Sequence, residues 1–189
     1  MKKLFTIIFL IVIFLLVFVP EFKAFLLRGA SELGVFNAKT DQKISAGETL
    51  YSHQFRYTDI NGKTYNSAAH LKEKVVFMNI WASWCAPCIA EFPGIQELYN
   101  YYKEDDEVIF ITFSLDDELQ TGINFLRKKE YNLPVFYLEN APSTSWYNGS
   151  LPTTLVLDKS GKVVYKKENM AHYNTDSFKA FLNGLKAQH

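Results

Sequence analysis

Cysteine and histidine are scarce in this chain, and their scarcity limits the metal chemistry that it can support. The 189 residues include only two cysteines, Cys85 and Cys88, and four histidines. A structural zinc site needs about four ligands, commonly supplied as closely spaced pairs. No second cysteine pair is present, and the histidines are scattered without a His-x-x-x-His spacing. A zinc half-site built on this pair is therefore disfavoured, and no metal is expected.

Net charge and sequence repetition are also lacking. Lys and Arg together number 20, as do Asp and Glu, so the formal net charge is zero. Nucleic-acid binding usually leaves a basic excess or stripe, so no nucleic-acid partner is predicted. No internal repeat or low-complexity tract is present either. In contrast, 16 Phe and 11 Tyr residues supply ample material for a hydrophobic core.

A long apolar run occupies the N-terminal region. Residues 4–19 contain Thr6 as their only polar residue and follow Lys2 and Lys3. As a helix the run would span about 24 Å, slightly short of a bilayer core of roughly 30 Å. It is slightly long for the apolar part of a signal peptide, and no clean cleavage site follows it. We predict an uncleaved membrane anchor, with a cleaved signal peptide or a buried helix as the alternatives.

The basic flank of this run predicts its orientation. Lys2 and Lys3 should remain in the cytoplasm, which places the rest of the chain outside the cytoplasmic membrane. A cleaved signal would export the cysteine pair as well. We therefore divide the chain into an anchor or signal segment at 1–23, a linker at 24–50 and a folded domain at 51–189. Within the linker, a short helix is expected near 30–36.

The most informative stretch is 75–88, VVFMNIWASWCAPC. An apolar, β-prone run ends at the cysteine pair, and beyond it apolar residues recur every three or four positions, as in a helix. These apolar positions are Ile89, Phe92, Ile95 and Tyr99. The cysteines are thus predicted where a buried strand gives way to a helix. Pro87 suits the first helical turn, because its missing N–H costs nothing there.

This placement predicts a reactive thiol. Cys85 would lie near the helix N-terminus, where unpaired N–H groups and the helix dipole favour an anion and lower a thiol pKa. Cys88, three residues later, would share the same helix face and could close a small disulfide ring. An inert structural disulfide is the alternative. It is disfavoured because a bridge across so short a loop restrains the unfolded chain little.

The rest of the chain predicts alternating strands and helices. A β-hairpin is expected at 55–65 around the Asn61-Gly62 turn signal. Further strands are expected at 108–115, 134–138, 153–158 and 162–166. Further helices are expected at 67–71, at 86–103 with a break or kink at Pro93, after a cap at Asp116 or Asp117, and from Asn174 or Thr175. The acidic turn at 104–107 is expected to be a solvated loop. This alternation implies an α/β domain with a central, largely buried sheet.

The strand, the Trp-Cys-x-Pro-Cys sequence and the helix together resemble the active-site signature of thioredoxin-like thiol–disulfide oxidoreductases. Three more features carry the resemblance: the Asn61-Gly62 hairpin, Glu91 with Pro93, and Leu151-Pro152-Thr153-Thr154. Over about 55–185 the chain is similar to the exported, often membrane-anchored TlpA/ResA type. The resemblance implies a thioredoxin fold, with a central mixed β-sheet flanked by helices, an added N-terminal β-hairpin and one preceding transmembrane helix.

The resemblance also implies roles for individual residues. Cys85 matches the exposed nucleophile, Cys88 the buried resolving cysteine and Pro152 a cis-proline opposite the pair. An ordinary trans proline at the start of a strand is the alternative for Pro152. The backbone of Leu151 would lie beside Cys85 and pair with an extended substrate segment. The predicted substrate-binding set is Trp84, Pro87, Leu151 and Pro152. Trp81 and Trp84 are expected to wall the site and to lie partly in the core.

Glu91 matches a glutamate that several of these proteins carry below the cysteines. It stands three residues after Cys88 and so shares its helix face. Cys88 must lose its proton to resolve a mixed disulfide, and a nearby carboxylate with a raised pKa could accept it. Thioredoxin has a buried acid six positions before its first cysteine, where this chain has Asn79. Glu91 is therefore the predicted base, with a solvated helix-start carboxylate as the alternative.

These features predict an exported thiol–disulfide oxidoreductase. The resemblance favours a reductant of apocytochrome c or of other exported proteins, itself re-reduced by a membrane thiol-electron carrier, without an organic cofactor. A peroxidase of the peroxiredoxin type is one alternative, but the Pro-x-x-x-Thr-x-x-Cys context that it needs is missing. A non-enzymatic binding module is the other, and the intact Cys85, Cys88 and Pro152 argue against it.

Overall fold

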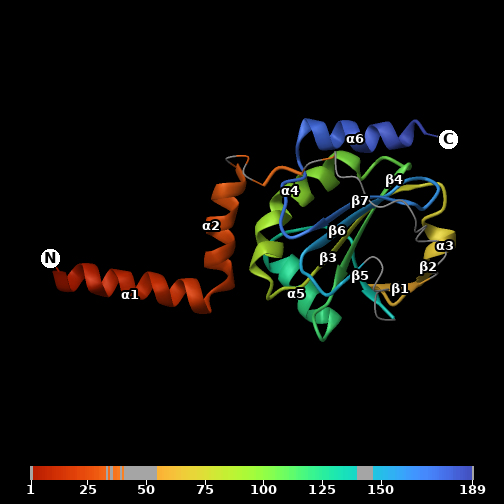
Figure 1. Cartoon of the computed structure of the whole chain (residues 1–189). Helices are drawn as coiled ribbons and strands as arrows, with labels where there is room; N and C mark the ends of the chain where they lie inside the picture. The colour runs from red at the N-terminus through yellow and green to blue at the C-terminus, as the bar shows by residue number, and fades with distance from the viewer. Residues whose placement is uncertain are drawn as a thin grey trace.

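Strands and helices alternate as the sequence predicts, and they form one seven-stranded sheet in the order β2-β1-β5-β4-β3-β6-β7 (Figure 1). The computed structural model describes residues 2–32, 34, 36–38, 40, 55–139 and 147–188. The strands are β1 (Arg56–Asp59), β2 (Thr64–Asn66), β3 (Val75–Trp81), β4 (Val108–Ser114), β5 (Val135–Leu138), β6 (Thr153–Leu157) and β7 (Val163–Glu168). The helices are α1 (Lys2–Phe18), α2 (Pro20–Glu32), α3 (Ser67–His70), α4 (Ala86–Tyr102), α5 (Leu119–Lys128) and α6 (Asp176–Lys186).

The central strand β3 organises the sheet. Its sequence, VVFMNIW, is rich in the β-branched and aromatic residues that favour strands, and all seven residues are buried. It pairs in parallel with β4 and antiparallel with β6, so the sheet is mixed. Alternate side chains point to opposite faces: Phe77 packs in the core beneath α4 and α6, whereas Met78 packs in the core beside β1.

The added N-terminal hairpin is confirmed. Strands β1 and β2 pair antiparallel on either side of the Asn61-Gly62 turn, and β1 extends the sheet by pairing with β5. Gly62 has a φ of 79°, a left-handed conformation that glycine adopts without steric cost. Together with the mixed sheet and its flanking helices, this hairpin bears out the predicted fold class.

Two features of the N-terminal region differ from the sequence expectations. The helix expected near 30–36 instead begins at Pro20, and this α2 packs along α4. Residues 24–32, the start of the predicted linker, therefore belong to a helix, while 41–50 lie outside the described residues. The expected helix α1 leaves α2 at an angle of 95°, and none of its residues is buried. No single described helix is long and apolar enough to cross a membrane, whereas this bent pair meets that test by length and composition.

Two smaller expectations also need correction. Helix α4 continues through Pro93 without the expected break, and the flanking Phe92 and Gly94 are buried. Their burial outweighs the one hydrogen bond that proline cannot donate, and the kink expected as the alternative stays a prediction. The acidic turn at 104–107 is only partly a solvated loop. Its Asp105 carboxylate lies 2.6 Å from Lys186 Nζ, and its Glu107 carboxylate lies 2.8 Å from Lys159 Nζ. The turn thus ties α6 to the start of β4.

Candidate active site

The cysteine pair lies at the junction of β3 and α4, as the sequence predicts. Cys85 is the N-cap residue of α4, and Cys88 lies in the first turn. The two are joined by a disulfide, and the backbone N–H of Cys88 donates to Cys85 Sγ at 3.3 Å. Cys85 is 6% exposed and Cys88 is 0% exposed. The N-terminal end of the helix, where the dipole favours negative charge, is therefore directed at the more accessible sulfur.

An apolar groove opens beside Cys85. Its volume is about 520 Å³, and it is lined by Trp84, Cys85, Pro87, Leu115, Tyr147, Gly149 and Leu151. Trp84 is 63% exposed, an unusual position for so large an apolar side chain. The groove thus brings together Cys85 and three of the four predicted substrate-binding residues. An accessible sulfur in an apolar depression suits an extended peptide segment carrying a disulfide.

The fourth predicted residue, Pro152, supports the groove from behind. The Leu151-Pro152 peptide bond is cis, which agrees with the sequence expectation. Pro152 is buried at the start of β6, whereas Leu151 lies in the groove wall. Among the described residues, none hydrogen-bonds to the backbone N–H or C=O of Leu151. That backbone is available for pairing with a bound strand.

The two tryptophans have different positions, although both were expected to wall the site. Trp84 does line the groove. Trp81 instead lies wholly in the core, with its ring centroid 4.7 Å from that of Phe92 and 5.7 Å from that of Phe125. Trp81 is the last residue of the buried strand β3 and packs against α4, whereas Trp84 lies beyond the strand in the loop next to Cys85.

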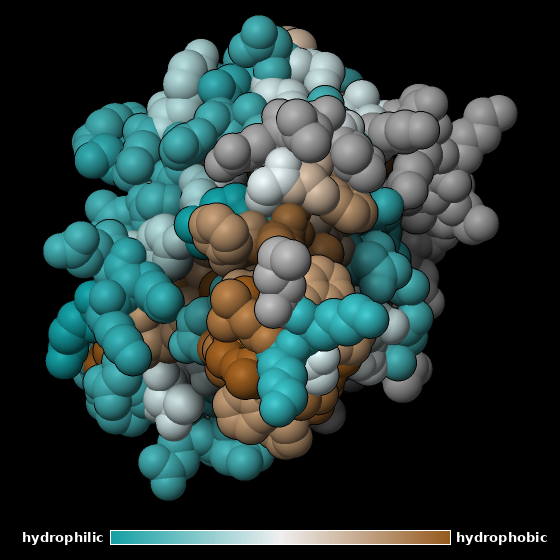
Figure 2. Space-filling view, turned by 90° about the vertical axis from the view of Figure 1, so that its left-hand side faces the viewer, coloured by the Kyte–Doolittle hydropathy of each residue, from teal (hydrophilic) through white to brown (hydrophobic). Residues whose placement is uncertain are grey.

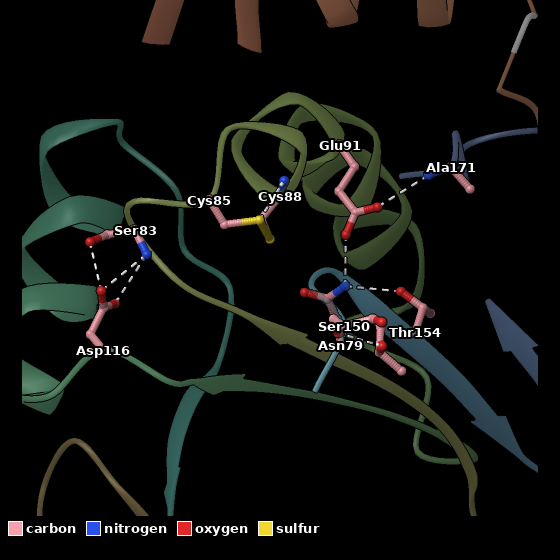
Figure 3. Close-up of a disulfide and its surroundings, with 10 residues drawn as sticks. Asn79, Ser83, Cys85, Cys88, Glu91, Asp116, Ser150, Thr154 and Ala171 are labelled. Carbon is pink, nitrogen blue, oxygen red and sulfur yellow. Dashed lines mark hydrogen bonds between the residues drawn. A yellow bond between two sulfur atoms is a disulfide. The ribbon is translucent and has the colours of Figure 1, made fainter. Parts of the chain in front are cut away.

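Glu91 lies buried behind the cysteine pair, between α4 and the sheet (Figure 3). It is 3% exposed. Asn79 Nδ2 donates to Glu91 Oε1 at 2.8 Å and also to Thr154 Oγ1 at 2.9 Å, and the backbone N–H of Ala171 donates to Glu91 Oε2 at 3.2 Å. Burial raises the pKa of Glu91 from 4.5 to about 8, although both hydrogen bonds act in the opposite direction. The alternative of a solvated carboxylate is therefore wrong.

The carboxyl group of Glu91 is directed at Asn79 and Ala171 rather than at sulfur (Figure 3). Among the described residues, no hydrogen bond joins Glu91 to Cys85 or Cys88. The structure thus supplies a buried group that titrates near neutral pH one helical turn beyond Cys88. Its role as a base remains a prediction.

Two buried tyrosines complete the surroundings of Glu91, and sequence reasoning missed both. Burial raises the pKa of Tyr165 and of Tyr173, and the charge of Glu91 raises both further. Both phenols therefore stay neutral, and they screen an ionised Glu91 poorly. Their sequence signal was weak, because a tyrosine in or near a strand is equally typical of an ordinary core.

Asp116 is a second buried carboxylate that sequence reasoning misplaced. It accepts hydrogen bonds from the backbone N–H of Ser83 at 3.1 Å and from Ser83 Oγ at 2.7 Å (Figure 3). It also accepts one from Ser114 Oγ at 2.7 Å. It does not cap α5, whose N-cap is Glu118 without a side-chain hydrogen bond. Because β3 and β4 are parallel and end together, Asp116 holds the loop that leads to Cys85.

Close packing supports this loop from below. A Cβ atom on Gly122 would lie 2.7 Å from Ser114 Oγ and 3.2 Å from Asp116 Oδ2, so α5 approaches the cluster as only glycine permits. Elsewhere in the described part of the chain, no group of three or more His, Cys, Asp or Glu side chains is arranged to hold a metal ion. The described site therefore offers two sulfurs, the buried carboxyl group of Glu91 behind them and the carboxylate of Asp116, which holds the loop before Cys85.

Comparison with known proteins supports the same chemistry, thiol–disulfide exchange, as the geometry of the site. The profile of the redoxin family matches residues 42–180. The thiol-disulfide oxidoreductase ResA of Bacillus cereus (strain ZK / E33L) is 39% identical over 115 residues, which are 59% of this chain and 64% of the relative. The chain thus spans slightly less than two thirds of that relative. ResA of Oceanobacillus iheyensis is 30% identical over 159 residues, which are 82% of this chain and 80% of the relative.

A solved structure agrees at the level of the fold. A thiol:disulfide interchange protein of the thioredoxin family from Chlorobium tepidum superimposes with a TM-score of 0.58 at 22% identity, covering 77% of this chain and 99% of that one. Since the profile covers well over half of its length, the chain belongs to the redoxin family, as a thioredoxin-fold protein of the ResA and TlpA type.

Proposed function

We propose that the protein is a thiol–disulfide oxidoreductase that reduces disulfides of exported proteins outside the cytoplasm. One observation carries the proposal. Cys85 lines an open apolar groove at the N-terminus of α4, while its partner Cys88 is buried within bonding distance. An attacking sulfur must reach its substrate, whereas a resolving sulfur needs to reach only the first sulfur.

The reaction follows from this division. In the dithiol form, the Cys85 thiolate attacks one sulfur of a partner disulfide, and the other partner sulfur leaves as a thiolate. Cys88 then loses its proton and attacks Cys85 Sγ. The bond between Cys85 and the partner breaks, and the partner departs as a dithiol with two added electrons. The Cys85–Cys88 disulfide of the structure is the product state.

The helix start favours the first step. Hydrogen bonding from the Cys88 N–H and the dipole of α4 both stabilise negative charge on Cys85 Sγ. The groove beside it would hold an extended substrate segment, with the backbone of Leu151 adding a strand-like hydrogen bond and Trp84 covering apolar side chains. Substrate selection would then depend on chain extension and apolar contact rather than on charge.

Glu91 is proposed to take the proton of Cys88. With a pKa of about 8, the Glu91 carboxyl group is mostly protonated at neutral pH in the disulfide form. This is the state in which proton transfer from Cys88 would leave it. No direct hydrogen bond joins the two groups, so the transfer would pass through a bridging molecule or a rotation of the Glu91 side chain.

The proposed partners come from the family resemblance and the N-terminal run. Exported proteins with disulfides, including apocytochrome c before haem attachment, would be the oxidants. A membrane thiol-electron carrier would return the Cys85–Cys88 pair to the dithiol. The helix α1 would anchor the chain with its folded domain on the outer side of the membrane.

A trapping experiment tests the proposal. The full chain carrying Cys88→Ser, in detergent or nanodiscs, is mixed with an oxidised apocytochrome c peptide, and non-reducing electrophoresis follows the products. We expect a mixed disulfide through Cys85 that the matched Cys85→Ser variant does not form. A parent protein that fails to reduce the peptide, and a Cys88→Ser variant that traps none of it, would overturn the proposal. Peroxide consumption above that of Cys85→Ser would instead indicate a thiol peroxidase.

A further inference from the structure

Helix α2 has two apolar faces, and only one of them is covered by the protein. On the inner face, Ala24 and Leu27 pack against Ile89, Ala90 and Met170. Ile89 directly follows Cys88, so α2 rests on the turns of α4 next to the cysteine pair. Burial of the α2 inner face thus occurs beside the active site.

Polar contacts fix this position of α2. Burial raises the pKa of Tyr131, and the guanidinium of Arg28, which faces the Tyr131 hydroxyl, opposes that shift. Beyond the helix, the N–H of His172 donates to the carbonyl of Phe36 at 2.7 Å, and the N–H of Ala38 donates to the carbonyl of His172 at 3.0 Å. The helix is therefore an integral part of the folded domain and not a loose tether.

The outer face of α2 is apolar and open. Phe25 is 67% exposed and Leu26 is 48% exposed. At 100° per residue, Phe22 lies between them on the same face, and Glu21 and Lys23 fall on its two edges. A helix that faces water carries polar residues on its outer side. This outer face therefore has the composition of a surface that meets an apolar phase.

The direction of α1 indicates which phase that is. Helix α1 leaves α2 at 95°, and its apolar side chains are exposed on all sides. Figure 1 shows α1 pointing away from the domain and α2 lying along the side of the domain that faces α1, next to α4. Figure 2 looks along α1, so the apolar patch in its middle includes the exposed side chains of α1 seen end-on, and hydrophilic residues surround this patch. The 17 residues of α1 span about 26 Å, slightly short of a bilayer core of roughly 30 Å, so an α1 that crossed it alone would place Lys2, Lys3 and the α1–α2 bend at headgroup level. If α1 runs in this way along the bilayer normal, a helix perpendicular to it lies in the bilayer plane.

We propose that α2 lies in the lipid headgroup region, with Phe22, Phe25 and Leu26 inserted toward the acyl chains, and that it holds the cysteine end of α4 beside the membrane surface. This inference rests on the proposed anchor and adds a fixed orientation to it. Packed helix axes lie about 8–10 Å apart. The Cys85–Cys88 pair is therefore held within about one helix diameter of the headgroups.

The orientation defines the class of partner. A disulfide that reaches Cys85 must itself lie close to the bilayer, as in the loop next to a transmembrane helix or in a chain emerging at the membrane. A flexible tether would instead allow the site to reach soluble partners at any height. Membrane-proximal proteins are thus the preferred partners.

Depth-dependent fluorescence quenching tests the position of α2. In the full chain with Cys85→Ser and Cys88→Ser, an environment-sensitive fluorophore is attached at Leu26→Cys, at Phe14→Cys in α1 or at Ser160→Cys in the β6–β7 turn. The protein is reconstituted in vesicles of phosphatidylcholine and phosphatidylglycerol that are brominated near either end of the acyl chains. We expect shallow quenching at position 26, deep quenching at position 14 and none at position 160. Quenching at 14 without quenching at 26 would overturn the α2 placement and keep the anchor, whereas no quenching at 14 would overturn the anchor.

Energy transfer tests the orientation of the active site. A donor on Cys85 in a Cys88→Ser chain is compared with a donor at Ser160→Cys, which lies at the opposite end of the sheet because Leu157 pairs with Val76. With acceptors on the lipid headgroups, we expect severalfold greater transfer from Cys85. The double variant Phe25→Asn/Leu26→Asn should reduce this difference while α1 stays inserted. Equal transfer from the two positions in the parent would contradict the proposal.

Discussion

At the scale of single residues, Glu91 is 3% exposed and has two hydrogen-bond donors among the described residues. Its carboxylate accepts from Asn79 and from the backbone of Ala171. Both donors stabilise the ionised form, but the loss of hydration outweighs them, and the pKa rises to about 8. The Asn79 amide is neutral and donates a hydrogen bond to Glu91, whereas an aspartate in its place would put a second carboxyl group next to that of Glu91 and repel its charge.

We predict that Glu91→Gln slows the resolving step and spares the attacking step. Glutamine keeps the size of the side chain and removes its basicity. Formation of the mixed disulfide should change little, since the helix start still favours the Cys85 thiolate. Resolution by Cys88 should slow at the low end of the roughly 10²–10⁴-fold range for losing a general base. Stopped-flow reduction of a model disulfide resolves the two steps, and equal resolving rates at pH 6–8 would show that Glu91 is not the base.

The same residue predicts a pH-dependent stability. Because its folded pKa lies above the usual value of 4.5, the native state binds the extra proton, and the free energy of unfolding falls as pH rises from about 5 to 8. Within that window the slope from this group approaches about 1.4 kcal/mol per pH unit. Denaturant titrations of the oxidised protein should show the slope, and Glu91→Gln should reduce it. The exposed Glu130→Gln serves as control, and equal slopes in all three proteins would argue against the raised pKa.

We predict that loss of the Asp116 carboxylate destabilises the protein next to the nucleophile Cys85. Asp116→Ala removes the acceptor of the Ser83 backbone N–H and of two hydroxyl groups, so the free energy of unfolding should fall by about 1–3 kcal/mol. The loop before Cys85 should loosen, and the alkylation rate of the reduced Cys85 should change. Chemical denaturation and iodoacetamide kinetics measure the two effects. The neighbouring exposed Asp117→Ala should leave both unchanged, and a loss of equal size there would refute the assignment.

At the scale of elements, β3 and α4 were predictable and α2 was not. The strand, its cysteines and the following helix are encoded locally, by an apolar run, a proline suited to a helix start and regular apolar spacing. The inner face of α2 is apolar because it packs on α4, and we propose that its outer face is apolar because it meets the membrane. A helix with two apolar faces cannot be placed by periodicity alone. Its partner residues, Ile89 and Met170, are distant in sequence.

The active site likewise combines residues that could be predicted from the sequence with contacts that could not. The spacing of the cysteines predicted Cys85 and Cys88 in one place, and the resemblance to thioredoxin-like proteins implied that Leu151 lies beside them. The hydrogen-bond partners of the buried carboxylates could not be predicted from the sequence, because Asp116 is 33 residues from Ser83 and Glu91 is 80 residues from Ala171. Burial of a carboxylate is a property of the assembled sheet and helices, and sequence spacing alone does not show it.

At the scale of the whole molecule, the proposed anchor in the N-terminal helices would determine where the chemistry takes place. We predict that the mature protein keeps residues 4–19 and fractionates with membranes, since the run is long, apolar and without a good cleavage site. Alkaline extraction of membranes followed by N-terminal sequencing measures both. A mature start near residues 24–31 would instead identify a cleaved signal.

The docking of α2 on α4 also bears on how the chain is made and handled. During synthesis, α1 and α2 emerge long before Ile89 and Met170. The apolar inner face of α2 therefore stays uncovered until most of the domain has been translated. A shortened protein that starts after Glu32 would leave Ile89, Ala90 and Met170 uncovered next to the cysteine pair. Such a fragment should self-associate through this patch, and redox potentials measured on it would describe an altered surface rather than the native one.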